Sequence, residues 1–165
     1  MDYLTGYPDH VRDRAQRLLE AGRLGEMLLE KYPTCHEIRT EKALYDHAVE
    51  LKSRHLRTAP ALSKVVYDPR ILVIEHVLGY HTRTSRVHGS QLKTRYEIRV
   101  ATVFRRGPQA FLDMILIHEL AHFKERLHNK AFYRLCENMN PDYHQLEFDL
   151  RLYLMYRDRV GELYE

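Results

Sequence analysis

The chain has few cysteines, no long apolar segment and little net charge. Its 165 residues include two cysteines, Cys35 and Cys136, which lie far apart in the sequence. This number excludes a disulfide framework and a zinc site built from cysteines, and it favours a reducing cytoplasm. The apolar run at residues 114–117 is far too short to span a bilayer. The N-terminal residues lack the pattern of a signal peptide. We therefore expect a cytoplasmic protein without a membrane partner.

The charge is unevenly distributed, although its net value is only +3. Between His81 and Gly107, seven lysines and arginines accompany one acid, Glu97. From Glu137 onward, seven acids accompany three arginines. The basic segment 83–106 would attract an anionic substrate or contact nucleic acid weakly. The solvated outer faces of ordinary strands would have the same composition.

Hydrophobic periodicity predicts helices at the start of the chain and strands in its middle. Residues 8–30 follow a helical pattern that breaks near 21–25, and Thr40 is placed to cap a further helix. Residues 63–68 and 71–80 are rich in β-branched side chains and are predicted strands. Residues 96–104 alternate between apolar and polar side chains, which is typical of a half-buried strand.

The second half of the chain is predicted to be mainly helical. Pro108 suits the first position of a helix, and residues 130–160 form one or two more helices, with an interruption near Pro141. No linker or repeat divides the chain. We therefore predict a single α+β domain over residues 1–165. It comprises a helical region at 1–60 and a core at 61–165, with a small, mostly antiparallel sheet.

Residues 118–128 read HELAHFKERLH and contain a candidate metal site. His118 and His122 are four residues apart, so on a helix both imidazoles share one face and can bind one Zn²⁺. Glu119 is placed to act on the metal-bound water, whose pKa zinc lowers to about 7, and to take up its proton. Two core histidines bonded to carbonyl groups would be the alternative interpretation.

His128 is the candidate third ligand. It lies six residues after His122, which on a continuous helix would rotate it by about 240°, to the opposite side. The helix must therefore end before Arg126 and the chain must curl back. Metzincins place a glycine where this chain has Glu125, but the turn residues near Asn129 still allow a bend. Glu137 and His144 are rival ligands, and a fourth side chain would indicate a structural metal.

The stretch and its flanks resemble the YgjP-like metal-dependent hydrolases, which are relatives of the WLM and SprT-like zinc metallopeptidases. The similarity rests on SRVHGS at 85–90, on the strand at 96–104, on HELAH, on the spacing to His128, and on Phe132 with the Pro-Asp-Tyr element at 141–143. It covers roughly residues 85–150. The first 60 residues, which are strongly helical, depart from the β-rich N-terminal part of that family.

The resemblance implies a zincin-like core with His118, His122 and His128 as ligands and Glu119 as base. Zinc is the expected metal, although other divalent transition metals suit imidazoles too. The implied function is a zinc-dependent, metallopeptidase-like hydrolase. Alternatives are a pyrophosphatase for nucleoside triphosphates of the UTP type and a SprT-like protease associated with DNA. The substrate is thus a peptide or a nucleotide.

Four further residues are candidate substrate-binding groups. Arg86, His88 and Ser90 could line the cleft and stabilise an oxyanion, but ordinary turn residues would look the same. Tyr143 could donate a hydrogen bond in the transition state, and packing is its alternative role.

Overall fold

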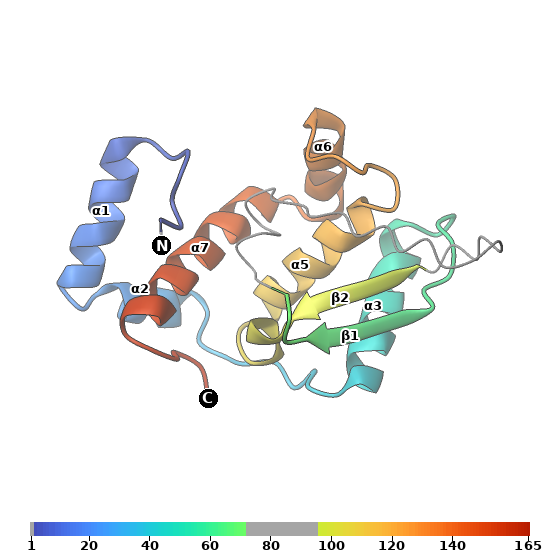
Figure 1. Cartoon of the computed structure of the whole chain (residues 1–165), viewed down its shortest axis with the longest axis horizontal. Coiled ribbons are helices and arrows are strands. Elements are labelled where there is room, and N and C mark those ends of the chain that lie inside the picture. The colour runs from blue at the N-terminus through green and yellow to red at the C-terminus, as the bar shows by residue number, and fades with distance from the viewer. Residues whose placement is uncertain (1, 72–95) are drawn as a thin grey trace.

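The computed structural model describes residues 2–71 and 96–165. The helices in these ranges are α1 (Asp9–Glu20), α2 (Leu24–Lys31), α3 (Glu41–His55), α5 (Gln109–Ala121), α6 (Lys130–Met139) and α7 (Tyr143–Arg159). The strands are β1 (Lys64–Asp68) and β2 (Glu97–Ala101), and a 3-10 helix, η1, covers Thr102–Arg105. Figure 1 shows α1 at one end of the molecule, the sheet with α3 toward the other end, and α5 and α7 between them. The α+β class is confirmed.

The predicted break in the first helical segment is confirmed. Helix α1 ends at Glu20 and α2 begins at Leu24. Gly22 adopts a φ of +69° between them, a left-handed conformation that glycine takes without a steric penalty. The Thr40 side chain accepts a hydrogen bond of 3.1 Å from the Ala43 N–H, as expected for the cap of α3.

The sheet corrects one prediction. Strands β1 and β2 pair in parallel, with Val65 opposite Ile98, so the expectation of a mostly antiparallel sheet is wrong. Alternation of apolar and polar side chains is the same for both strand directions, and the pattern could not distinguish them. A parallel pair requires a crossover connection of about a dozen residues or more, and the chain between β1 and β2 is long enough to supply it. The predicted strand at 71–80 falls almost wholly outside the described residues.

Strand β2 is shorter than the alternation at 96–104 suggested. Its pairing with β1 ends where Ala101 faces Asp68, the last residue of β1. Beyond that register no partner continues the ladder within the described residues, and the chain tightens into η1. The Phe104 side chain is buried all the same, although its backbone belongs to η1 and not to a strand.

Helix α5 is the central helix of the described fold. It packs against α3, β2, α6 and α7, and its run from Met114 to His118 is buried. Pro108 immediately precedes it as the N-cap, one position before the predicted place. Of the one or two helices predicted for residues 130–160, the structure has two, α6 and α7, and they are separated at residues 140–142, where the interruption was expected.

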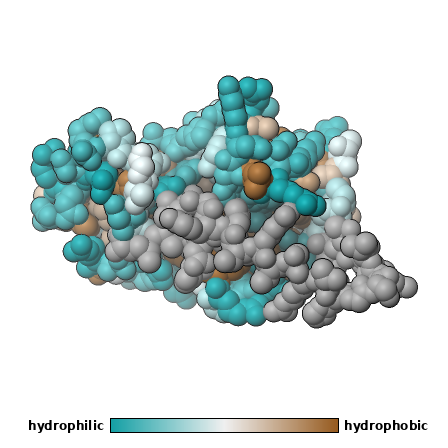
Figure 2. Space-filling model, turned by 45° about the horizontal axis from the view of Figure 1, so that its top comes forward, coloured by the Kyte–Doolittle hydropathy of each residue, from teal (hydrophilic) through white to brown (hydrophobic). Residues whose placement is uncertain are grey.

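One face of the molecule is largely polar where its residues are described. Figure 2 shows mostly hydrophilic side chains among the described residues of that face, with isolated apolar ones between them. Within the described ranges, no helix combines the length and the apolar character needed to cross a membrane.

Candidate metal centre

The C-terminal end of α5 carries the first two histidines of the HELAH motif. His118 lies in the last turn and is buried, and His122 is the C-cap. The apolar residues that precede them draw this helix into the core, so the motif is held on a rigid element. Backbone carbonyls at a helix C-terminus present partial negative charge, which favours a cation at this end.

The chain turns directly after His122, as the sequence analysis required. The Glu125 N–H donates to the Ala121 carbonyl at 2.9 Å, and the N–H of Lys124 donates to the same oxygen at 3.1 Å. Helix α6 then begins after Asn129, whose side chain accepts a hydrogen bond from the Phe132 N–H at 2.9 Å. Asn129, rather than a glycine, therefore starts the next helix and places His128 just before it.

The three imidazoles converge through the same ring atom. The Nε2 atoms of His118, His122 and His128 lie 3.0 to 3.2 Å from one another. Three nitrogens held at about 2.05 Å in tetrahedral directions around one zinc ion would be about 3.3 Å apart. Nitrogen lone pairs at such separations repel unless a cation or a proton lies between them. The donor set and its spacing therefore fit a transition-metal ion.

Phe132 forms an apolar support beneath the three rings. Its centroid lies 4.9 Å from that of His118, 4.5 Å from that of His122 and 4.8 Å from that of His128. The Phe132 side chain is fully buried. One aromatic ring from α6 therefore contacts every member of the triad and limits how each imidazole can tilt.

The opposite nitrogens of two imidazoles are bonded to the protein. His122 Nδ1 lies 2.9 Å from the Glu125 carbonyl oxygen, and His118 Nδ1 lies 2.7 Å from the Tyr143 hydroxyl. Metal-binding histidines commonly use such partners to fix the ring orientation. Nothing in the sequence pattern signalled the Glu125 carbonyl, because a backbone oxygen carries no residue preference.

The neighbouring carboxylates and His144 stand apart from the converging nitrogens. Among the described residues, the group of metal-compatible donor atoms contains the three histidines and not Glu119, Glu137 or His144. Glu137 and His144 pair with each other at 2.6 Å on the surface. Glu119 follows His118 on α5 and is half-buried. It therefore adjoins the triad without belonging to it.

Comparison with known proteins agrees with this geometry. A model of the YgjP-like metallopeptidase domain matches residues 79–153. An Escherichia coli K12 protein named UTP pyrophosphatase is 52% identical over 154 residues, which is 93% of this chain and 92% of that protein. This chain belongs to the YgjP-like family. No solved structure matches it significantly.

Membership of the YgjP-like family confirms the predicted resemblance and makes the chain a hydrolase. The family description indicates a metal, and the histidine triad could bind one. The high coverage on both sides means that the helical N-terminal region, which departed from the expected pattern, is part of the aligned length.

Of the four candidate substrate-binding residues in this YgjP-like chain, the structure describes only Tyr143. Arg86, His88 and Ser90 lie outside the described residues, as does most of the basic segment. Tyr143 lies with its side chain 1% exposed and its hydroxyl on the far side of His118 from the triad centre. That position makes Tyr143 a neighbour of a triad histidine and leaves almost none of its surface to a substrate.

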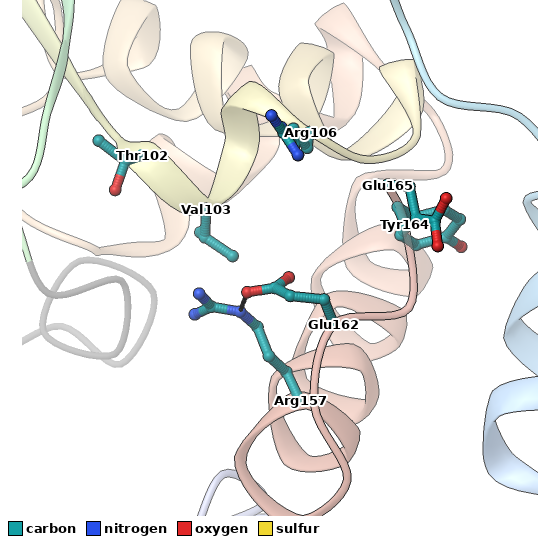
Figure 3. A pocket seen from close by; sticks show the side chains of 7 residues that line it. All are labelled: Thr102, Val103, Arg106, Arg157, Glu162, Tyr164 and Glu165. Atoms are coloured by element: carbon teal, nitrogen blue, oxygen red, sulfur yellow. Dashed lines mark hydrogen bonds and ion pairs between the residues drawn. The ribbon is translucent and has the colours of Figure 1, made fainter.

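A cavity of about 480 Å³ lies elsewhere in the molecule, between η1 and the C-terminal segment. Arg157 and Glu162 meet in an ion pair beside it, and no triad histidine lines it (Figure 3). The cavity is therefore separate from the candidate metal centre of this YgjP-like protein.

Proposed function

We propose that the chain is a zinc-dependent hydrolase with a zincin-like active site. His118, His122 and His128 would hold the metal and Glu119 would act as general base. The observation that carries the proposal is the convergence of three Nε2 atoms within 3.0 to 3.2 Å at the end of the helix that also bears Glu119. Neutral imidazole ligands favour zinc, and cobalt, nickel or iron would fit the same donors.

When bound, the zinc ion supplies Lewis acidity, which makes water nucleophilic near neutral pH and draws electron density from the bond to be cleaved. The Glu119 carboxylate takes a proton from the attacking water and passes it to the leaving group. The imidazoles remain neutral throughout. Beneath them, the buried ring of Phe132 excludes solvent from the inner side of the site.

The main substrate proposal is a peptide. The matching family is described as a metallopeptidase domain. In peptide hydrolysis the leaving group is an amine, which needs the proton that Glu119 carries. Three histidines and a neighbouring glutamate supply what this reaction requires.

The second substrate proposal is a nucleoside triphosphate, and two observations favour it. The bacterial relative is named UTP pyrophosphatase. In addition, Lys124, Arg126, Lys130 and Arg134 are exposed on and beside the loop that carries His128. None of these four side chains forms an ion pair with another described residue, so their charges remain available to phosphate groups. The same attack would then cleave a phosphoanhydride bond.

A DNA-associated, SprT-like protease remains a prediction from the resemblance and from the basic segment 83–106. Neither comparison names a nucleic acid. A change in DNA mobility that disappears with added salt would support it.

One panel of assays separates the substrate classes. The zinc-loaded protein is given nucleoside triphosphates, with pyrophosphate release as the readout, and an unstructured protein, with new amino termini as the readout. Activity on one class that is lost on chelation and restored by zinc assigns the function. If the zinc-loaded protein hydrolyses neither class, the proposed function is contradicted.

A further inference from the structure

The triad can bind a cation only if each imidazole presents a lone pair at Nε2. A neutral imidazole carries one proton, so each Nδ1 of a ligand must be the protonated nitrogen. The hydrogen-bond partner of Nδ1 therefore decides whether the ring is set for metal binding or against it.

His122 has an unambiguous partner. A carbonyl oxygen can only accept, so the contact of 2.9 Å with the Glu125 oxygen requires a proton on His122 Nδ1. The backbone thereby holds this ring in the metal-binding tautomer. No side-chain substitution removes that acceptor directly.

His118 has an ambiguous partner. The Tyr143 hydroxyl, 2.7 Å from His118 Nδ1, can donate or accept. The buried thiol of Cys136 is a second polar neighbour of this hydroxyl. A thiol sulfur can accept a hydrogen bond, although weakly, so the phenol proton can point to Cys136 and leave an oxygen lone pair facing His118.

We propose that Tyr143 is a positioning residue for the metal centre. Its hydroxyl oxygen accepts a hydrogen bond from His118 Nδ1–H and so presents His118 Nε2 to the cation. This role rests on the proposed function, since it presumes that the triad binds a metal. Tyr143 then acts on the Nδ1 side of His118, away from the three converging Nε2 atoms, and does not contact the substrate.

The chain offers a matched control in Tyr133. Its ring lies in the same aromatic cluster, 5.2 Å from the Phe132 ring and 6.3 Å from that of Tyr143. The Tyr133 side chain is half-buried, and its hydroxyl forms no hydrogen bond with the triad among the described residues. Tyr133→Phe therefore removes a hydroxyl from the cluster without removing a partner of an imidazole.

The test measures cobalt(II) and zinc affinity of the full-length protein by competition with a chromophoric chelator. Loss of an outer hydrogen bond typically weakens metal binding by about 10- to 100-fold, which is the expected effect of Tyr143→Phe. The visible absorption of bound cobalt should also change in Tyr143→Phe and stay unchanged in Tyr133→Phe. Equal affinities and equal spectra in the two variants would overturn the proposal.

Two further measurements distinguish a failure of the positioning role from a failure of the proposed function. If His118→Ala binds cobalt as tightly as the wild type, the triad is not the metal site and the proposed function fails. In the zinc-loaded wild type, NMR of ¹⁵N-labelled histidine should show a slowly exchanging Nδ1 proton on His118, close to the Tyr143 ring. A rapidly exchanging proton there would overturn the positioning role even if Tyr143→Phe did not fold.

Discussion

Two groups of histidines lie along α5 and differ in what their nitrogens contact. At the C-terminal end, His118, His122 and His128 place their Nε2 atoms against one another. Near the first half of the helix, His36 and His47 place theirs against protein acceptors: Nε2 of His36 on the Phe104 carbonyl and Nε2 of His47 on the Asp113 carboxylate. Both groups are at least partly buried, so burial alone does not distinguish them.

The contrast between the two groups shows which arrangement of histidines is suited to hold a metal. His36 uses both ring nitrogens within the fold, since Nδ1 accepts a hydrogen bond from the Ile38 N–H at 3.0 Å. His47 joins α3 to α5 through an ion pair. In the triad, by contrast, His118 and His122 are bonded to the protein at Nδ1, while the Nε2 atoms of all three rings meet. Convergence of one atom type, rather than the number of histidines, indicates metal binding.

The largest expected effect is the loss of turnover when Glu119, the proposed general base, is replaced. Glu119→Gln should lower hydrolysis by about 10²- to 10⁴-fold, because the amide cannot accept the proton from water. Metal affinity should stay near the wild-type value, since Glu119 is outside the group of donor atoms. Turnover and metal content measured on the same preparation check this. Full activity in the variant would remove Glu119 from the mechanism.

The next largest effect is on zinc affinity, and it compares His128 of the triad with His144, which pairs with Glu137. His128→Ala should weaken zinc affinity by more than the roughly 10- to 100-fold typical of losing an outer partner. His144→Ala should change it little, because His144 is exposed and pairs with Glu137. Competition titrations with a chelator measure both variants. Similar losses in both would mean that His144 contributes to the site after all.

A smaller effect concerns His47 of the other group, whose contribution to the free energy of unfolding should depend on pH. The hydrogen bond that His47 Nε2–H donates to the Asp113 carboxylate raises the pKa of His47, so protonated His47 stabilises the fold. This stabilisation is fully present below the unfolded pKa of about 6.5 and is lost as pH rises through the folded pKa. Asp113→Asn should therefore lower the free energy of unfolding by about 1 kcal/mol at pH 5.5 and by less at pH 8.5.

Chemical denaturation of the metal-free protein at several pH values gives the difference curve. His36 should act in the opposite sense, because burial lowers its pKa and acid then favours the unfolded chain. A difference between wild type and Asp113→Asn that grows with pH would contradict the assigned pair.

The smallest effect compares two helix caps of the same kind. Thr40→Ala and Asn129→Ala each remove a side-chain acceptor from a helix N-terminus, at a cost of about 1 kcal/mol in stability. Only Asn129 adjoins His128, and its acceptor holds the N–H of Phe132. Asn129→Ala should therefore also weaken zinc binding, whereas Thr40→Ala should not. Thermal unfolding and metal titration together check the pair, and equal zinc affinities would show that the cap of α6 does not support the site.

Much of the secondary structure followed from local pattern. The cap at Thr40, the break before α2 and the interruption at Pro141 all depend on residues close in sequence, and each appears in the fold. The direction of β2 relative to β1 does not depend on local pattern, because alternation specifies which face is buried and not which way a strand runs. The length of β2 was set by where its partner ends.

That His118 and His122 share one face of a buried helix follows from the sequence alone, because the period of the α-helix and the apolar run before them leave little choice. The contact of His122 with the Glu125 carbonyl is also local in sequence, but it depends on the exact backbone of the turn, which residue types do not specify. The hydroxyl of Tyr143 behind His118 joins residues 25 apart, and only the packing of α7 against α5 brings them within hydrogen-bonding distance.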